Sequence, residues 1–559
     1  MSLNQQKKIS TPKVVSNDIE YLINEEEKTA GIISCKSSEE QLIIPTTIID
    51  NSKEYDITII FKQAFKFSKI NSIRFAADSK LQEIDEEAFI YSNIESIEIP
   101  SEVKRICKNA FFACERLRKI EIPNDSKLQT IESNAFSYTP IESIYLPSKV
   151  VELHKEWCYE TSKLNKVIVS PDNPYFKTYE DKMIIGKKNI ESTNYDQLIF
   201  CARNVETITI PNFIECICTY AFFRCEQLRQ IEISSDSKLK TIEKCAFSYT
   251  PIESIYLPSK VVELHKEWCY ETSKLNKVII SPDNPYFKIY EDKMIIGKKN
   301  IESTNYDQLI FCARNVETIT IPNFIECICT CSFDNCKQIQ KVEFLNDSKL
   351  EIIEDESFFN SSIRTIKISS KVTKIGSNAF FKCEKLQRIE ISNDSELQII
   401  GDFAFAYSPI RSFTFPPEVT KIAAMTFSHC KYLYSIEIPH DSKLQMICDF
   451  AFRDSTIERI KIPSRVTQIG NFAFYCCEKL QRVEITNDSE LQIIESYAFH
   501  KTSIESIVIP SKITSIAETA FLNCNKLQII EFSDKSMFKL IGNGIIMIPV
   551  TGKAGKRTY

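Results

Sequence analysis

One cysteine-rich run carries the residues whose types and spacing could most readily do chemistry. The run Cys327–Cys331 reads CICTC, and alternate residues of a strand face the same side, so these thiols could bind a soft metal ion. Zinc sites more often use CxxC pairs, and the related run at Cys216 and Cys218 carries Tyr220 in the third position. We therefore favour structural thiols, and the sequence predicts no metal site.

Groups for acid–base or phosphate chemistry are scarce. No spacing pairs one of the few histidines with a thiol as a nucleophilic couple, and the 10 glycines form neither GxGxxG nor GxxxxGK. We expect no catalytic residue, no cofactor and no enzymatic activity. The histidines are His154, His265, His429, His440 and His500.

The elements that position these residues are repeats. An Ala-Phe pair, with Ser or Thr for Ala in some copies, is followed about six residues later by a run of the form LxxIxIP. The spacings alternate between 22 and 25 residues, within the range of leucine-rich repeats. The pairs place Phe at Phe65, Phe89, Phe111, Phe136, Phe222, Phe247, Phe333, Phe358, Phe380, Phe405, Phe427, Phe452, Phe474, Phe499 and Phe521, with degenerate copies at Cys158 and Cys269.

Each unit has a strand with one buried face. Ile120 and Ile122 alternate with Lys119 and Glu121, and the pair Ala110–Phe111 is expected in a short helical or irregular segment. One unit cannot bury these residues alone, so neighbours must stack. The sequence predicts an α/β repeat solenoid, a leucine-rich-repeat horseshoe or superhelix of about 17 repeats, with one long parallel sheet on its concave face.

A cysteine recurs three residues after the Phe wherever a 25-residue step follows. In leucine-rich repeats this position holds Asn or Cys, whose side chain reaches backbone groups or packs as a small apolar group. We predict structural thiols and no disulfide framework. The positions are Cys114, Cys225, Cys336, Cys383, Cys430, Cys477 and Cys524.

A recent duplication is visible on a larger scale. Residues 125–220 recur at 236–331 with only six differences, and each copy carries an insert, at about 171–204 and 282–315, that is expected to form a β-hairpin. The predicted organisation is an N-terminal β-rich cap at 1–53, the solenoid at 54–546 and a short tail at 547–559. No C-terminal cap is evident, so we consider that two chains could associate through the C-terminal edge of the solenoid.

The predicted concave face offers a column of outward residues, which we take as the candidate binding surface. Tyr145 and Tyr256 would be aromatic anchors on it. A basic column lies beside this outward column. If Lys119 pairs with Glu121, or Arg482 with Glu484, the predicted concave face is only a solvated charged surface. The column is Glu98, Glu121, Tyr145, Thr209, Glu232, Tyr256, Thr320, Glu343, Glu390, Glu437, Glu484 and Glu531.

The repeat unit LxxIxxxAFxxCxxLxxIxIP resembles the BspA-like leucine-rich repeat family, also called leucine-rich repeat type 5. The segments LQIIGDFAF, ending at Phe405, and VTKIGSNAFFKCEKLQRIEIS, starting at Val372, carry the resemblance, which covers about nine-tenths of the chain. It implies a surface-antigen or adhesin-like role, with binding to host extracellular or cell-surface proteins and no catalytic residues.

The function that follows is a non-enzymatic protein-binding solenoid for adhesion or host interaction. The alternative is an intracellular scaffold, because no signal peptide or membrane span is recognisable and cell-surface, secreted and cytoplasmic locations all stay open. A net charge of -6 argues against nucleic acid as a partner. Four NDS strings, at Asn124, Asn346, Asn393 and Asn487, fit glycosylation sites, but we favour turn chemistry for them.

Overall fold

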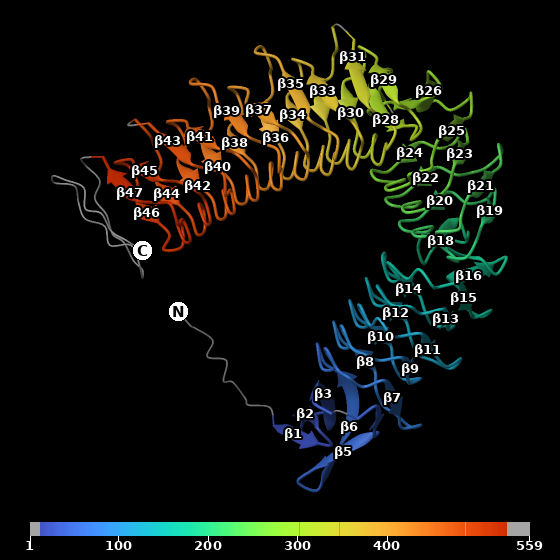
Figure 1. The fold of residues 1–559 in the computed structure, drawn as a ribbon. Helices are drawn as coiled ribbons and strands as arrows, with labels where there is room; N and C mark the ends of the chain where they lie inside the picture. The colour runs from blue at the N-terminus through green and yellow to red at the C-terminus, as the bar shows by residue number, and fades with distance from the viewer. Residues whose placement is uncertain (1–11, 38, 301, 346, 487, 534–559) are drawn as a thin grey trace, which may run out of the picture. The chain divides into compact units, whose positions relative to one another are not determined.

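The fold is a stack of coils built from strands and turns. The computed structural model describes residues 12–533 except 38, 301, 346 and 487, and it divides into unit 1, Met1–Thr272, and unit 2, Ser273–Tyr559 (Figure 1). No helix occurs among the described residues, and therefore none that could cross a membrane. The solenoid prediction is confirmed at this level, whereas the helical half of the α/β class is wrong.

Each regular coil contributes a long strand of three or four residues, a short strand of two, and a turn that carries the Ala-Phe pair. The long strands of unit 1 are β7 (Ser72–Phe75), β9 (Ser96–Glu98), β11 (Lys119–Glu121), β13 (Ser143–Leu146), β15 (Lys166–Val169), β19 (Thr207–Ile210), β21 (Gln230–Ile233) and β23 (Ser254–Leu257). Its short strands are β8 (Glu83–Ile84), β10 (Arg105–Ile106), β12 (Thr130–Ile131), β14 (Glu152–Leu153), β20 (Cys216–Ile217), β22 (Thr241–Ile242) and β24 (Glu263–Leu264).

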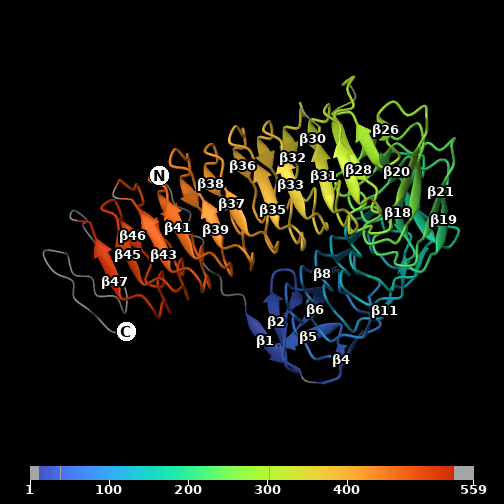
Figure 2. The ribbon, with the colours of Figure 1, turned by 45° about the horizontal axis from the view of Figure 1, so that its top comes forward.

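Unit 2 repeats this plan, with its long strands side by side in Figure 2. They are β25 (Lys277–Ile280), β29 (Thr318–Ile321), β31 (Lys341–Phe344), β33 (Thr365–Ile368), β35 (Arg388–Ile391), β37 (Ser412–Thr414), β39 (Ser435–Glu437), β41 (Arg459–Ile462), β43 (Arg482–Ile485), β45 (Ser506–Ile509) and β47 (Ile529–Phe532). The short strands are β30 (Cys327–Ile328), β32 (Ile352–Ile353), β34 (Lys374–Ile375), β36 (Ile399–Ile400), β38 (Lys421–Ile422), β40 (Met446–Ile447), β42 (Gln468–Ile469), β44 (Ile493–Ile494) and β46 (Ser515–Ile516).

Two rows of parallel strands line the coils, where the sequence predicted one sheet. The long strands pair in register, as Ile97 with Ile120 in β9 and β11, and the short strands pair separately, as Ile106 with Ile131 in β10 and β12. A two-residue strand is too short to show the alternation by which a sheet is recognised in sequence. The second sheet was therefore missed.

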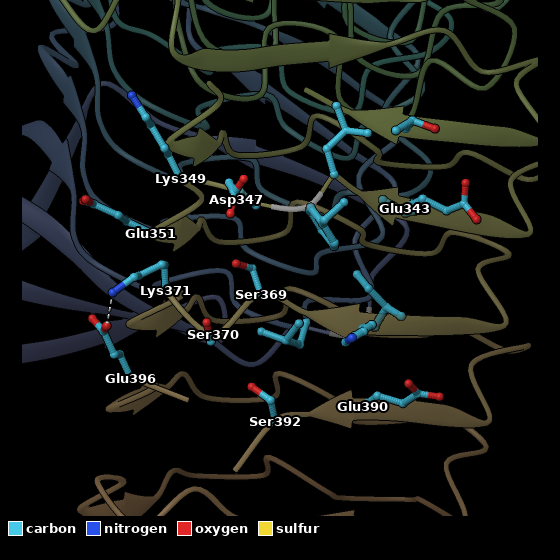
Figure 3. Close-up of a pocket in the computed structure, with 18 of the residues that line it drawn as sticks. Glu343, Asp347, Lys349, Glu351, Ser369, Ser370, Lys371, Glu390, Ser392 and Glu396 are labelled. Carbon is cyan, nitrogen blue, oxygen red and sulfur yellow. Dashed lines mark hydrogen bonds and ion pairs between the residues drawn. The ribbon is translucent and has the colours of Figure 1, made fainter. Parts of the chain in front are cut away.

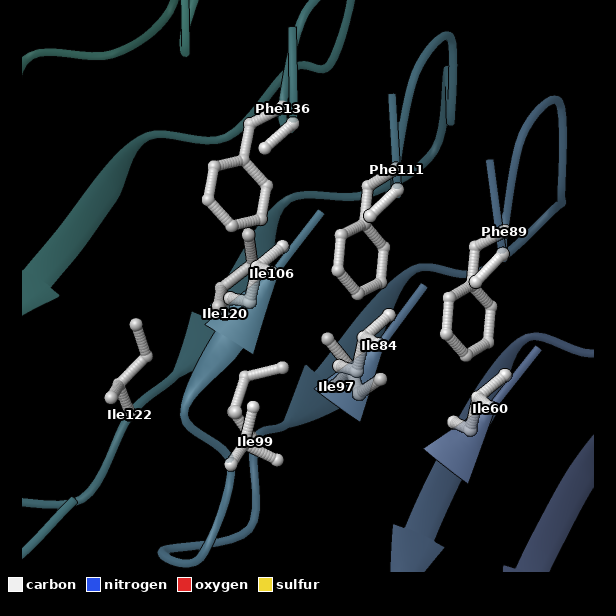
Figure 4. Close-up of a cluster of buried hydrophobic side chains, with 14 of the residues drawn as sticks. Ile60, Ile84, Phe89, Ile97, Ile99, Ile106, Phe111, Ile120, Ile122 and Phe136 are labelled. Atoms are coloured by element: carbon white, nitrogen blue, oxygen red, sulfur yellow. The ribbon is translucent and has the colours of Figure 1, made fainter. Parts of the chain in front are cut away.

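The core lies between the two sheets and the turn (Figure 4). Ile97 and Ile120 come from the long strands and Ile106 from a short one, while the Phe rings of successive coils stack behind them. Phe111 is fully buried, with its ring centroid 4.9 Å from that of Phe89 and 5.5 Å from that of Phe136. The predicted burial of Phe and Ile by neighbouring coils is confirmed.

The turn that carries the Ala-Phe pair cannot become a helix. The residues two before and two after the Phe have positive φ, as at Asn109 (57°) and Ala113 (54°) around Phe111, and this left-handed backbone interrupts a right-handed helix on both sides. The backbone instead bonds to the next coil, since the Phe111 N–H donates to the Ala135 carbonyl at 2.8 Å. Hydrogen bonding along the stack offsets the cost of these conformations.

The N-terminal strands are arranged differently from the coils. They are β1 (Lys13–Ser16), β2 (Ile19–Asn24), β3 (Thr29–Cys35), β4 (Gln41–Ile44), β5 (Thr47–Asp50) and β6 (Lys53–Ile60). Antiparallel pairing joins β1 to β2 and β2 to β3, after which β3 pairs with β6 in parallel and β6 with β8. These strands extend the short-strand sheet of unit 1, and β4 extends the long-strand sheet through β7. The predicted C-terminal edge and tail lie outside the described residues.

Each duplicated insert forms a three-stranded meander. In unit 1 it comprises β16 (Phe176–Tyr179), β17 (Met183–Gly186) and β18 (Gln197–Cys201), and in unit 2 β26 (Phe287–Tyr290), β27 (Met294–Gly297) and β28 (Gln308–Cys312). The first two strands of each set make an antiparallel hairpin. The third strand pairs in parallel with a short strand, β20 or β30, so it belongs to the solenoid wall.

Candidate binding surfaces

The outward column lies on the long strands, at the third residue of each. Its glutamates are exposed, whereas Tyr145, Tyr256 and Thr320 are half-buried. The members do not lie on one hydrogen-bonded sheet, because within unit 1 the strands around Glu121 and those around Glu232 belong to separate sheets. The structure therefore distributes the predicted residues over four sheets: Glu98, Glu121 and Tyr145; Thr209, Glu232 and Tyr256; Thr320, Glu343 and Glu390; and Glu437, Glu484 and Glu531.

Charges within one long strand largely satisfy one another. Lys119 forms an ion pair with Glu121, and the Arg482 Nε lies 2.9 Å from Glu484 Oε1. The pairing that the sequence predicted is thus observed at these two strands. Exposed pairs of this kind contribute only about 0–1 kcal/mol, so they maintain solubility more than stability.

A groove of about 1320 Å³ opens on unit 2 between the long-strand column and the start of the short strands. Glu343 and Glu390 lie on one side and Lys349, Glu351, Lys371 and Glu396 on the other, with Ser369, Ser370 and Ser392 between them (Figure 3). Most comparable coils have Pro where this coil has Ser369. That departure from the IP pattern was the sequence signal for the groove, and it was missed.

The groove is acidic. Seven carboxylates and four lysines line it, and Lys371 Nζ lies 2.6 Å from Glu396 Oε1, which raises the pKa of Lys371. A hydrogen bond from Ser392 lowers the pKa of Asp394, so this carboxylate stays charged. Leu345, 49% exposed, adds an apolar contact beside these groups. The arrangement suits a basic, partly apolar peptide segment better than a small anionic molecule.

A second surface runs along the turns of unit 1. We call Phe67, Tyr91, Phe112, Tyr138 and Tyr159 the turn aromatic column; they stand one or two residues after the Phe position of successive coils. Neighbouring ring centroids lie 5.4, 6.0, 5.2 and 5.7 Å apart. Phe67, Tyr91 and Tyr138 are 65%, 46% and 44% exposed. Sequence reasoning missed this column because its position alternates between two offsets.

The family model of the BspA type leucine rich repeat region matches residues 48–165, 188–310, 304–434 and 398–528, which is most of the chain. The chain belongs to this family. Its coils can therefore be called BspA-type coils, and the resemblance inferred from the sequence is confirmed. Among curated proteins, none matches the sequence.

Several solved structures are similar to this chain. A leucine rich cell surface protein from Faecalibacterium prausnitzii is 20% identical, with 94% of this chain and 95% of that one covered and a TM-score of 0.31. A leucine-rich repeat protein from Eubacterium ventriosum is 16% identical over 81% and 96%, with a TM-score of 0.37. The pneumococcal vaccine antigen PcpA is 16% identical over 95% and 99%, with a TM-score of 0.29. Family membership rests on the family model and not on these structures.

The cysteine ladder of the BspA-type coils is structural, as predicted. Cys383 is fully buried, and its Sγ donates to the Phe358 carbonyl of the preceding coil at 3.1 Å. Burial raises the pKa of Cys383 to about 12, so the thiol stays protonated and unreactive.

Cys225 occupies the same ladder position but faces a buried arginine. Arg203 is 4% exposed, its guanidinium lies over the Phe200 ring at 4.6 Å, and its Nη1 donates to Cys225 Sγ at 3.6 Å and to the Ala221 carbonyl at 3.2 Å. Burial alone raises the pKa of the Cys225 thiol. The hydrogen bond with the Cys201 thiol and the charge of Arg203 outweigh burial and lower this pKa to about 7.

Two groups of side chains bring three possible metal-ligand atoms within 4.8 Å of one another in the described part of the chain. One is Glu83, Asp85 and Cys107, where Arg105 Nη1 already lies 3.6 Å from Glu83. The other consists of the buried Cys327 and the half-buried Cys329 and Glu354. One carboxylate of the first group is therefore already close to a cation.

The NDS strings at Asn124 and Asn393 occupy turns after long strands. Ser126 follows Asn124 by two residues and is buried, and its Oγ accepts the N–H of Leu128 at 3.2 Å. Ser395, two residues after Asn393, bonds Leu397 in the same way at 3.3 Å. Hydrogen bonds of this kind are typical of turns, which is the interpretation that we favoured for these strings. Asn346 and Asn487 lie outside the described residues.

Proposed function

We propose that this chain is a non-enzymatic, protein-binding solenoid that works in adhesion or host interaction. The turn aromatic column is the observation that carries the proposal. Phe67, Tyr91 and Tyr138 of this row of contacting rings are exposed. Monomeric proteins seldom leave such an aromatic surface exposed unless a partner covers it, and aromatic residues dominate the binding energy of protein interfaces. The acidic groove of unit 2 would add a polar contact elsewhere on the chain.

Binding to intact host cells, or to extracellular proteins isolated from them, tests this proposal. We expect the double variant Tyr91→Ser/Tyr138→Ser to bind at least about 10-fold more weakly than the native chain, because both rings are taken as central contacts. Tyr434→Ser is the matched control, since Tyr434 is 53% exposed and lies outside the column. Equal binding by the native chain and both variants would refute a role for the column.

The second candidate, an intracellular scaffold, is favoured by the thiols. Most of the 21 cysteines are buried, and thiols such as that of Cys383 donate hydrogen bonds to backbone carbonyls of the preceding coil. Counting free thiols in protein from its native source separates the two functions. Oxidised or glycosylated protein supports export, whereas fully reduced and unglycosylated protein supports the scaffold.

A further inference from the structure

Two lysines and two tyrosines gather at one end of the inserted hairpin of unit 1. We call Lys177, Lys187, Tyr175 and Tyr195 the insert cluster. Lys177 Nζ lies 4.2 Å from the centroid of the Tyr195 ring, and Lys187 Nζ lies 5.3 Å from the same centroid. Lys187 Nζ also lies 5.9 Å from the centroid of the Tyr175 ring. Two ammonium groups therefore share one aromatic ring, at distances where a cation is attracted to it.

The insert cluster is held in place by the backbone. Antiparallel pairing joins β16 to β17, and the Lys187 N–H donates to the Tyr175 carbonyl at 3.1 Å, two residues before Lys177. Both lysines therefore lie at the end of the hairpin where β16 begins and β17 ends. The Tyr195 hydroxyl donates to the Pro174 carbonyl at 2.9 Å and fixes the ring between them. A ligand that binds here meets a site that is already ordered.

The two positive charges of the insert cluster are not neutralised by the chain. Neither Lys177 nor Lys187 forms an ion pair with a carboxylate of the described residues. Glu180 and Asp181 lie in the hairpin turn, at the opposite end of the strands. Asp196 is half-buried and accepts a hydrogen bond from the adjacent amide side chain at 2.7 Å. Because like charges repel, an anion that binds beside both lysines lowers their electrostatic free energy.

The loop of residues 187–196 adds an apolar contact to these charges. Ile190 is 69% exposed. A sulfated glycan would cover the lysines but leave this side chain in water. The cluster and its neighbour Lys188 supply fewer basic groups than the roughly four to eight that are typical of surfaces for anionic lipids, and Glu191 stands next to Ile190. A peptide with both carboxylates and apolar side chains matches the charge and the apolar contact.

We propose that the insert cluster binds an acidic peptide segment of a partner protein. A carboxylate of the segment lies beside the ammonium groups of Lys177 and Lys187, and an adjacent apolar side chain covers Ile190. This site is separate from the turn aromatic column, and it serves a partner inside or outside the cell equally well.

The duplicated insert of unit 2 carries the same cluster. Lys288 Nζ and Lys298 Nζ lie 4.2 and 5.2 Å from the centroid of the Tyr306 ring. The Tyr306 hydroxyl donates to the Pro285 carbonyl at 3.0 Å. Each unit therefore offers one site, and variants of one copy can be compared with variants of the other.

Fluorescence polarisation of a short fluorescein-labelled peptide, built from repeated Asp-Glu-Leu triplets, measures binding to the full chain. The chain carries a net charge of -6, so it does not attract an acidic peptide as a whole, and binding reports a local basic site. We expect the native chain to bind this peptide at least about 10-fold more tightly than the same peptide with Asn and Gln in place of Asp and Glu. Added salt should weaken the binding.

Variants of the lysines locate the site. Lys288→Ala/Lys298→Ala leaves only the unit 1 copy and should still bind the peptide. In that background, Lys177→Ala/Lys187→Ala should weaken binding at least about 10-fold, because both cationic contacts are lost. Lys177→Arg/Lys187→Arg should retain binding, since arginine keeps the charge and the contact with the ring.

A matched control removes the same charge elsewhere in the same background. Lys163→Ala/Lys182→Ala replaces exposed side chains outside the cluster and should leave binding unchanged. The variant Tyr91→Ser/Tyr138→Ser should also bind the peptide normally, which separates this site from the turn aromatic column.

Several results would overturn the proposal. They are no binding of the peptide by the native chain or by the background variant, equal binding of the uncharged peptide, and equal losses in the control pair and the cluster pair. Binding of heparin or of anionic lipid vesicles without binding of the peptide would also overturn it, because the cluster would then recognise a glycan or a membrane.

Discussion

Replacing Phe380 by Ala removes one ring from the stack that fills the BspA-type coils of unit 2. Phe380 is fully buried, its ring centroid lies 4.9 Å from that of Phe358 and 5.6 Å from that of Phe405, and its N–H donates to the Ala404 carbonyl at 2.8 Å. Alanine keeps this backbone bond, so the loss is confined to packing. We expect the free energy of unfolding to fall by about 3–5 kcal/mol, the usual cost of such a cavity.

Urea unfolding followed by far-ultraviolet circular dichroism measures this loss, with Phe381→Ala as the matched control. Phe381 is the next residue, half-buried, with its ring centroid 5.3 Å from that of Phe359, so we expect a cost of roughly 1–2 kcal/mol. Neighbouring coils stabilise each other, so the variant should also lower the cooperativity of the transition. If Phe380→Ala costs no more than Phe381→Ala, the ring stack is not the core of the solenoid.

Three further predictions concern stability. The pKa of Cys225 is lowered from an ordinary value of 9.0 to about 7 in the folded state, so its thiolate stabilises the fold above pH 9 and this contribution is lost as the pH falls through 7. Urea titrations from pH 7 to 9 should therefore show a steeper rise in the free energy of unfolding for the native chain than for Cys225→Ser. Equal slopes would contradict the pairing with Arg203. Gly376→Ala should lower the free energy of unfolding by about 1–3 kcal/mol, because a Cβ at this position would stand 2.4 Å from the backbone nitrogen of Asp355 in the preceding coil. An unchanged urea midpoint would show that the two coils can move apart without loss of stability. Arg482→Ala should change stability by less than about 1 kcal/mol, because its partner Glu484 is exposed to solvent; a larger loss in the same assay would mean that the long-strand ion pairs matter to the fold.

The repeat pattern was enough to predict the solenoid, the burial of residues such as Phe111 and the structural role of Cys383. It could not exclude a helix at the Ala-Phe pair, because the left-handed backbone at Asn109 and Ala113 involves residues other than glycine. Short strands such as β10 carry no alternation and were not recognised as a second sheet. Local patterns therefore revealed the spacing of the coils more readily than the path of the chain within each coil.

The candidate surfaces were harder to predict than the fold. The outward column was placed on the correct face of the long strands, but breaks between sheets divide it. The groove of unit 2 is lined by residues of successive coils, from Thr320 to Glu396, and the turn aromatic column of unit 1 is likewise assembled from successive turns. Contacts between successive coils determine both sites, and a single repeat does not display them.

If the chain binds other proteins outside the cell, as we propose, it must be exposed there. Labelling intact cells of the native organism with a membrane-impermeant amine reagent, followed by capture of the labelled chain, tests it most directly. We expect the chain to be labelled while an abundant cytosolic protein in the same cells is not. Labelling only after the cells are lysed would contradict the claim and favour the intracellular scaffold.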